Sequence, residues 1–397
     1  MIIQVVDEKT GCQSVYAQEQ LFDLSDLNVA AKYVTWKHSP LLSKLDCDYA
    51  WVWSGGRTLE QCCPEDLRES FDKVNLELRA HMTAMKTARV CLETNCFFDL
   101  IPAPLVDQYF AMKNKICKSV MSSPPIDNYA FMKDVHIMME EISNHDLNLD
   151  PSNINHMRYK SRTRDFLSRL ERVQKRIQLE IFGSKTGRLT TRKGTFPILN
   201  LQKDHRSILK PVNDVLVELD FNSAEARTFL ALSGKKDIKE DIHKWNLENV
   251  ANNQGDREEM KERFFAWLYN PESKDSSFDV VYNKEAVKGD YWDGERVTNP
   301  FGRIVPSDER RCINYLIQST TNDIVLENAL KIREMLQGRS SRISFTLHDS
   351  VVIDFAKEDK NLLMPIVKTF EETRLGYYRA NVKMGKDFGN MKDIRIV

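Results

Sequence analysis

Hydrophobic and polar positions alternate in two rhythms along this chain, and the change of rhythm outlines its elements. Short β-like runs, "IIQVV", "QSVYA" and "YAWVW", fill the first 75 or so residues. From Val74 the apolar residues recur every three or four positions, which predicts helices in "VNLELRAHMTAMKTARVCLE" and "APLVDQYFAMKNKICKSVM". A third helix is expected in "RDFLSRLERVQKRIQLEIF". Its apolar stripe consists of Phe166, Leu170, Val173, Ile177 and Ile181.

The second half of the chain contains an apolar strand that ends in an acid. Val215 to Leu219 runs into Asp220, and a helix is predicted three residues later. After a second helix, "DREEMKERFFAWLY", and a loop-rich connection, a long helix is expected from about Arg310 to Leu336. The alternation in "RISFTLHDSVVIDF" predicts a hairpin with His348 and Asp349 at its bend. A helix and a short strand are expected near the C-terminus.

Composition describes an ordinary globular chain with one strongly basic segment. The 397 residues are 42% hydrophobic, and no window approaches the roughly 18 uncharged apolar residues of a membrane span. Eight cysteines show no C-x-x-C spacing, so neither a zinc site nor a disulfide framework is indicated. The net charge is −1, yet Met157 to Lys210 contains fifteen basic residues and four acids. A phosphate-rich partner is the favoured interpretation, and a solvated helix face is the alternative.

Asp220 and Asp349 are the first candidates for chemistry. Taken singly, an aspartate at a strand end is more typical of a turn or a helix cap. If the two strands are neighbours, however, the carboxylates come together, and a divalent cation would offset their repulsion. Such a pair suits Mg²⁺ chemistry on phosphates.

Two helices place candidate binding side chains at uniform spacings of four, so that they line one face. In the first helix these are Arg257, Lys261, Phe265 and Tyr269. Two cations followed by two aromatic rings can bind a triphosphate and a base, although a surface helix with a polar side and a core side has the same pattern. In the second helix they are Arg310, Asn314 and Gln318, which can reach minor-groove acceptors or simply face solvent.

Together these stretches resemble the family A DNA polymerases, the DNA polymerase I type. "DFNSAEAR" is similar to their first palm motif, "LHDSVVIDF" to their last, and the helix beginning at Arg257 to their fingers helix. "TGRLTT" with "LNLQ" resembles the Thr-Gly-Arg loop, and "DIH" precedes the fingers helix as in the family. "RRCINYLIQSTTND" and "MGKDFGNMKD" resemble the later helix and the C-terminal strand. The motifs keep the family's order from about Val74 onward.

The resemblance implies a role for each matching residue. Asp220 and Asp349 would bind two Mg²⁺ ions, which Mn²⁺ can replace, with help from the Phe221 carbonyl. Lys261 would also give a proton to the leaving pyrophosphate, and Glu225 would exclude a 2′-hydroxyl. Residues implied to hold the nucleotide are Arg257, Lys261, His243, Phe265, Tyr269 and Glu225. Residues implied to contact DNA are Arg188, Arg206, Arg310, Asn314, Gln318 and His348. Arg227 is expected to be structural support.

Three positions depart from the family pattern: Ser350, Asn270 and Ser319 replace its usual Glu, Gly and Gly. His-Asp-Ser also occurs in single-subunit RNA polymerases, so an RNA polymerase is the first alternative, against which Glu225 argues. The second alternative is a catalytically inactive DNA-binding homologue. Both carboxylates and the Arg257/Lys261 face are retained, which argues against it.

The expected architecture is α+β: a right-hand polymerase fold with an antiparallel palm sheet, a helical thumb and reduced helical fingers. The predicted segments are 1–75 of unknown role, 76–210 thumb and N-terminal palm elements with the basic segment, 211–235 palm, 236–300 fingers, and 301–397 palm. No Asp-x-Glu occurs in the first hundred residues, so no proofreading exonuclease is expected in this chain. Expected partners are primer-template DNA and deoxynucleoside triphosphates, with a processivity factor or separate exonuclease as further candidates and no membrane. A cytoplasmic location is predicted, in a bacterial host if the source is a phage.

Overall fold

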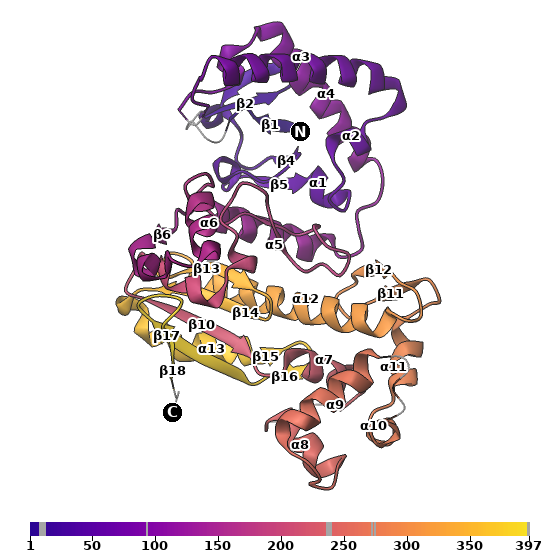
Figure 1. Cartoon of the computed structure of the whole chain (residues 1–397). Helices are drawn as coiled ribbons and strands as arrows, with labels where there is room; N and C mark the ends of the chain where they lie inside the picture. Colours follow the sequence, from indigo (N-terminus) through magenta and orange to yellow (C-terminus); the bar gives the residue numbers. More distant parts are fainter. Residues whose placement is uncertain (8–12, 93, 236–239, 271–272, 274, 395–397) are drawn as a thin grey trace. The chain divides into compact units, whose positions relative to one another are not determined.

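The computed structural model describes residues 1–7, 13–92, 94–235, 240–270, 273 and 275–394. The chain forms two compact units, Met1–Glu140 and Glu141–Val397, and each is described by itself (Figure 1). In the part of the chain that the structure describes, no helix is long and apolar enough to cross a membrane. The cysteines of that part are free thiols.

The first unit combines small sheets with helices. Its antiparallel sheet is β1 (Ile3–Val5), β2 (Ser14–Ala17) and β3 (Gln20–Asp23), while β4 (Lys32–Thr35) pairs in parallel with β5 (Asp46–Tyr49). The helices are α1 (Ala50–Trp53), α2 (Leu59–Cys62), α3 (Arg68–Thr87), α4 (Ala103–Met121) and α5 (Tyr129–Ser143), the last crossing the unit boundary.

Two predictions for this unit need correction. "YAWVW" is not one strand, because Tyr49 ends β5 and the next four residues form α1. A short, continuously apolar run fits a buried strand or a buried helical turn equally well. The helix expected from Val74 begins earlier, at Arg68, because Glu69 and Asp72 interrupt the apolar pattern without interrupting the helix. α4 agrees with the prediction.

The second unit is built on a five-stranded antiparallel sheet with the order β13-β14-β10-β17-β18. β10 (Val215–Phe221) lies at its centre, between β14 (Ser350–Phe355) and β17 (Ala380–Gly385). The outer strands are β13 (Arg342–Leu347) and β18 (Lys392–Asp393). The helices α12 (Cys312–Met335) and α13 (Leu363–Glu371) pack on one another and on strands of this sheet (Figure 1). The predicted α+β fold with an antiparallel palm sheet is confirmed.

A group of shorter helices follows the sheet's central strand. α7 (Ala224–Leu232), α8 (Ile242–Asn249), α9 (Arg257–Tyr269), α10 (Ser276–Val281) and α11 (Lys284–Tyr291) share a core with the start of α12. Phe264, Trp267 and Phe278 are among its fully buried aromatic residues. The remaining small strands are β6 (Asn148–Leu149), β7 (Leu179–Glu180), β8 (Thr190–Thr191), β9 (Leu209–Lys210), β11 (Arg296–Thr298), β12 (Ile304–Pro306), β15 (Glu372–Thr373) and β16 (Gly376–Tyr377).

The third predicted helix is correct only in its first half. α6 spans Ser161–Leu170, and the chain then turns into β7, which pairs with β8. Ile177, Leu179 and Ile181 are all buried, which is the alternation of a strand. Positions four apart fit both a helical and a strand period, so the pair Ile177 and Ile181 could not distinguish them.

Candidate active site

The two aspartates meet at one end of the palm sheet. β10 pairs with β14 so that Asp220 lies opposite Ser350, the residue after Asp349. The Phe221 N–H donates to the Asp349 carbonyl at 3.3 Å. His348 adopts a left-handed φ of 54° at the bend of the β13–β14 hairpin, and it is exposed. Packing of the two strands side by side therefore brings the two predicted carboxylates to neighbouring positions.

The carboxylates repel one another in a partly buried place. Burial, followed by the charge of Asp349, raises the pKa of Asp220 to about 7. Burial also raises the pKa of Asp349, and nearby Glu225 adds to the effect. Ionisation of both carboxylates is unfavourable without a nearby positive charge. Their oxygen atoms are ligands that suit a divalent cation such as Mg²⁺. Among the described residues, no group of three or more His, Cys, Asp or Glu side chains could hold a metal ion, so the fit rests on these two acids and on backbone oxygens.

Glu225 is held by two of the predicted site residues. Arg188 Nη2 donates to its Oε1 at 2.5 Å, and the Tyr269 hydroxyl donates to its Oε2 at 2.5 Å. Glu225 lies in the first turn of α7, which starts after Ser223 in a left-handed conformation with φ 54°. Together with burial, the charge of Glu225 raises the pKa of Asp349, so the turn from β10 into α7 places Glu225 near that aspartate. The fingers helix α9 and the Thr-Gly-Arg loop converge on this carboxylate.

The cations of α9 have different surroundings. Arg257 donates through Nε and Nη2 to Asp241 Oδ2, at 3.1 and 2.8 Å, and also contacts Glu258. The hydrogen bond that Arg257 donates to Asp241 raises the pKa of Arg257. Lys261, one turn later, is exposed and has no ion pair with any described residue. Asp241 also accepts from the backbone N–H groups of residues 243 and 244, so it caps α8 and holds Arg257 at once.

His243, which the resemblance implies as a triphosphate ligand, is buried in this structure. Its ring is 1% exposed, and burial lowers its pKa to about 4, so it is neutral near pH 7. The ring lies 5.8 Å from the Phe265 ring, centre to centre. Its Nδ1 is buried without a hydrogen-bond partner among the described residues. The neutral His243 ring therefore packs near Phe265, and its role in holding the triphosphate stays a prediction.

The aromatic pair of α9 stands beside the α12 face. Phe265 and Tyr269 stack with centroids 5.9 Å apart. Tyr269, Arg310 and Asn314 line one cavity of about 760 Å³, and the Asn314 Oδ1 is buried in it without a described partner. Gln318 lies one turn further along α12 and is partly exposed. The structure therefore places Arg310 and Asn314 beside Tyr269 of α9, and their contact with DNA stays a prediction.

The Thr-Gly-Arg loop depends on a glycine. Gly187 has φ 78°, and a Cβ there would lie 2.4 Å from the Arg303 guanidinium carbon. Arg303 is itself buried and donates to both carboxylate oxygens of Asp323 on α12, at 2.8 and 2.7 Å. A side chain at position 187 would therefore displace a buried ion pair as well as strain the turn. The pair positions the loop from which Arg188 reaches Glu225.

The arrangement was compared with known proteins. No family model matches the chain, and no curated protein matches it. A solved structure does: the POL domain of Pol1 from M. smegmatis, in complex with DNA primer-template and dNTP. The two have a TM-score of 0.67 and 11% sequence identity, over 98% of this chain and 95% of that one. The fold is that of a family A polymerase domain.

Within this family A polymerase fold, Arg206 contacts the segment after β17, and His348 lies next to Asp349 at the β13–β14 bend. The Arg206 guanidinium carbon stacks 4.7 Å from the centre of the Phe388 ring, and its Nε is buried without a described partner. Arg227 is buried and donates to the carbonyls of Asn222 and Glu240, at 2.9 and 2.7 Å. Those bonds support the turn after Asp220, in keeping with the structural role expected for Arg227.

Sequence reasoning missed two residues of the polymerase fold's central strands. Asn381 on β17 lies opposite Asp220 and hydrogen-bonds to it, which acts to lower the Asp220 pKa that burial raises. Lys383 on the same strand pairs with Glu218 at 3.5 Å, and its charge also favours ionised Asp220. The signal was available in part, since "ANVKMG" alternates like a strand and its last two residues begin "MGKDFGNMKD". Its register with β10 could not be read from that alternation.

Proposed function

We propose that this protein is a template-directed DNA polymerase that adds deoxynucleotides to a primer 3′ end. The observation that carries the proposal is the meeting of Asp220 and Asp349 on adjoining strands, with Glu225 held close by Arg188 and Tyr269. The likeness to a POL domain seen with primer-template DNA and dNTP supports it, and at 11% identity that likeness concerns the fold.

In the proposed reaction the primer 3′-hydroxyl attacks the α-phosphorus of the incoming nucleotide. The hydroxyl loses its proton to solvent, a new phosphorus–oxygen bond forms, the bond from the α-phosphorus to the bridging oxygen breaks, and pyrophosphate leaves with the electron pair. Lys261, exposed on α9, is suited to binding the triphosphate as a mobile point charge and to giving the leaving pyrophosphate a proton. Arg257, fixed by Asp241, is suited to holding phosphate oxygens in a defined orientation.

Asp220, Asp349 and the Phe221 carbonyl are the groups proposed to hold two Mg²⁺ ions, with Mn²⁺ as a substitute. Bound there, the ions would lower the pKa of the attacking hydroxyl and stabilise the charge on the leaving oxygen. Glu225 is proposed to pack against the sugar, so that a 2′-hydroxyl finds no room and no free acceptor. Phe265 and Tyr269 would stack near the incoming base.

Primer extension with a labelled primer-template tests the proposal. Wild-type protein with Mg²⁺ is expected to extend with deoxynucleotides and to discriminate against ribonucleotides. Asp220→Ala and Asp349→Ala should each lower the rate about a thousandfold or more, since each removes a metal ligand. DNA binding, measured by fluorescence anisotropy, should change by about twofold at most, because the carboxylates do not attract DNA.

Glu334→Ala is the matched control, because Glu334 is an exposed acid of the same unit on α12. It should leave both extension and binding unchanged. Extension that survives either aspartate substitution would show that the metal site is wrongly assigned. A strong preference of the wild type for ribonucleotides would favour the RNA polymerase alternative that Ser350 raises. Binding without any extension would favour an inactive homologue.

The proposed partners are primer-template DNA and deoxynucleoside triphosphates. A role in DNA replication or repair, a cytoplasmic location, a phage source and a separate processivity factor or exonuclease stay predictions from the sequence. The segment assignments, with a thumb in 76–210 and fingers in 236–300, are likewise part of this proposal.

A further inference from the structure

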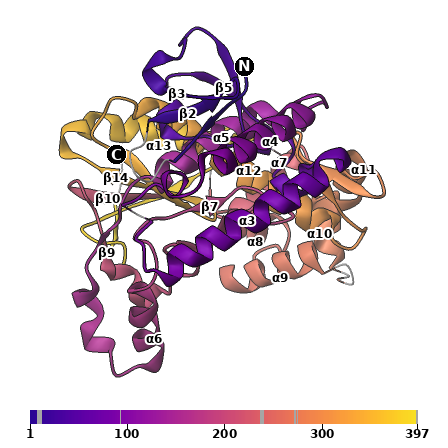
Figure 2. The ribbon, with the colours of Figure 1, turned by 90° about the horizontal axis from the view of Figure 1, so that it is seen from above.

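A second cavity lies between α6 and the segment 195–205, away from the two aspartates. It has a volume of about 400 Å³, toward the lower end of the usual range for small-ligand pockets, about 300 to 1,000 Å³. Both whole-chain views show α6 and the group α8–α10 at separate places (Figures 1 and 2). None of the residues lining this cavity belongs to the Asp220 site. The proposed reaction therefore leaves it without a role.

The inner wall of this α6 cavity is flat and apolar. Phe166 stacks on His205 with centroids 4.6 Å apart and an interplanar angle of 14°. The His205 Nε2 lies 3.1 Å from the Thr163 hydroxyl, and burial lowers the pKa of His205, which favours a neutral ring. Leu170, Val173 and Pro197 complete the apolar surface. Such a wall suits a planar, uncharged ring system.

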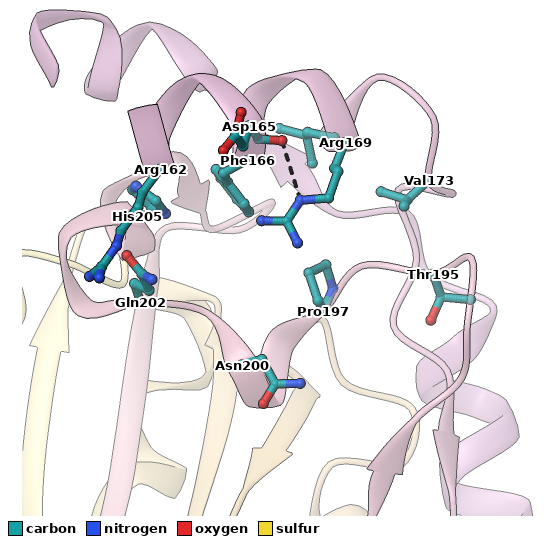
Figure 3. A pocket seen from close by; sticks show the side chains of 11 residues that line it. Arg162, Asp165, Phe166, Arg169, Val173, Thr195, Pro197, Asn200, Gln202 and His205 are labelled. Carbon is teal, nitrogen blue, oxygen red and sulfur yellow. Dashed lines mark hydrogen bonds between the residues drawn. The ribbon is translucent and has the colours of Figure 1, made fainter. Parts of the chain in front are cut away.

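The rim of the cavity is cationic. Arg162 and Arg169 are exposed, two turns apart on the α6 face that also carries Phe166. Figure 3 shows the Arg169 side chain reaching from α6 toward Pro197, while its Nε donates to the Asp165 carbonyl at 3.3 Å. The exposed Asp165 is the one acid among the described lining residues. The rim therefore carries one excess positive charge.

These two arginines differ from many other cations of the basic segment. Five of those cations form ion pairs with described acids: Lys160 with Asp204, Arg176 with Asp146, Arg188 with Glu225, Arg192 with Glu180 and Lys210 with Asp150. Arg162 and Arg169 form no ion pair with any acid that the structure describes. Their charge is left for an outside anion.

We propose that the α6 cavity holds an unpaired nucleotide of a single DNA strand. Its base would stack against the Phe166–His205 wall, and its phosphates would meet Arg162 and Arg169. The exposed amides of Asn200 and Gln202, on the opposite side of the cavity in Figure 3, offer donors and acceptors to the base edge. The inference deepens the proposed function and rests on it for its substrate, because a polymerase template has an unpaired strand beyond the duplex.

Binding without Mg²⁺ and without nucleotide tests the cavity apart from catalysis. The probes are a fluorescent oligodeoxythymidylate of about 12 nucleotides and a blunt duplex of equal length. Arg162→Ala/Arg169→Ala should weaken single-strand binding about tenfold and duplex binding about threefold at most. Val173→Trp, which fills the cavity without changing charge, should also weaken only single-strand binding, with a wild-type circular dichroism spectrum showing that it folds.

Lys175→Ala/Lys193→Ala is the matched control, because it removes two exposed cations of the same segment that do not line the cavity. It should weaken both probes equally and slightly. Equal losses on both probes in the arginine variant, or undiminished single-strand binding by Val173→Trp, would overturn the proposal in favour of general attraction to DNA. Competition by an apolar peptide, but not by oligodeoxythymidylate, would assign the cavity to a protein partner instead. Failure of primer extension would leave these readings intact, so the two proposals fail separately.

Discussion

The palm strands bring like charges together, whereas the fingers helix pairs opposite charges. On the palm, Asp220 and Asp349 are like charges at neighbouring positions, and burial with their mutual repulsion raises the pKa of Asp220 to about 7. On the fingers helix, Arg257 already forms an ion pair with Asp241. The hydrogen bond that Arg257 donates to this carboxylate raises the pKa of Arg257. In the proposed function, a bound cation would offset the repulsion between the two palm carboxylates. The fingers helix is preorganised by opposite charges before any ligand arrives.

Glu225 interacts both with a residue of the fingers helix and with a palm carboxylate. Its carboxylate accepts from Arg188 and Tyr269, as in the fingers, while its charge raises the pKa of Asp349, as in the palm. The difference between the regions is that like charges meet on the palm, whereas opposite charges fix the side chains of the fingers helix. Substitutions should therefore affect the two regions through different measurements.

Glu225→Ala should have the largest effect among tests of this comparison. Removing the side chain opens space at the sugar and frees Arg188 and Tyr269, so ribonucleotide discrimination should fall about a hundredfold. The ratio of kcat/KM for deoxy- and ribonucleotides measures it. Glu225→Gln is the control, because it keeps the bulk and an acceptor for Tyr269 and should keep most of the discrimination. An unchanged ratio in Glu225→Ala would contradict a steric role.

Substitutions of the two α9 cations, Arg257 and Lys261, should have the next largest effects. Arg257→Ala should raise the KM for deoxynucleotides about thirtyfold and lower Tm by several degrees, because the half-buried Asp241 loses its partner. Lys261→Ala should raise KM about tenfold and lower kcat, with Tm unchanged, since exposed Lys261 has no ion pair with any described residue.

Arg257→Lys provides the matched control for that pair of variants. It keeps the charge but loses the two-nitrogen contact with Asp241, so Tm should recover in part while KM stays raised. Equal Tm losses in Arg257→Ala and Lys261→Ala would mean that the Asp241 pair does not preorganise the helix.

The pH dependence of stability tests the palm side. The folded pKa of Asp220, about 7, lies above that of the unfolded chain, so the folded state binds more protons between about pH 4 and pH 7. Stability without metal should therefore fall as pH rises through this window, and the whole cost is present above pH 7. Asp220→Asn should remove the fall and stabilise the metal-free protein on the order of 2 kcal/mol at about pH 8, with little effect near pH 4.

Urea unfolding at both pH values measures that effect. Glu334→Gln is the control and should follow the wild type at each pH. Mg²⁺ should raise the Tm of the wild type at about pH 8 and leave Asp220→Asn nearly unchanged, because binding to the folded state alone stabilises it. A wild type whose stability rises from pH 4 to pH 8 in parallel with Asp220→Asn would show that the carboxylates do not repel.

Much of the fold could be predicted because local pattern and motif agreed. β10, α7, α9, α12 and the β13–β14 hairpin lie where strand alternation, helical spacing and the palm motifs placed them. The hydropathy pattern failed to predict the secondary structure where one spacing of apolar residues fits both a helix and a strand. α6 ends at Leu170 because the following residues pair as β7, and pairing with β8 is a contact that no local period contains.

The candidate site shows the same division. Residues on one helix, such as Arg257 and Lys261, are placed by spacing alone. Contacts across elements, such as Asp241 with Arg257 or Asn381 with Asp220, depend on how helices and strands meet. The burial of His243 could not be predicted from the sequence either, because a motif specifies a residue type and not how its ring packs.

Tyr269→Phe tests the smallest contribution. It keeps the ring that stacks on Phe265 and removes only the hydroxyl that donates to Glu225. Arg188 still holds the other carboxylate oxygen, so Glu225 should stay in place, and discrimination against ribonucleotides should fall only about threefold. Tyr269→Ala also removes the stack and should raise the KM for deoxynucleotides about tenfold in the same assay. If Tyr269→Phe lost as much discrimination as Glu225→Ala, the hydroxyl rather than Arg188 would be what fixes the carboxylate, and the preorganisation assigned to opposite charges would rest on a neutral donor.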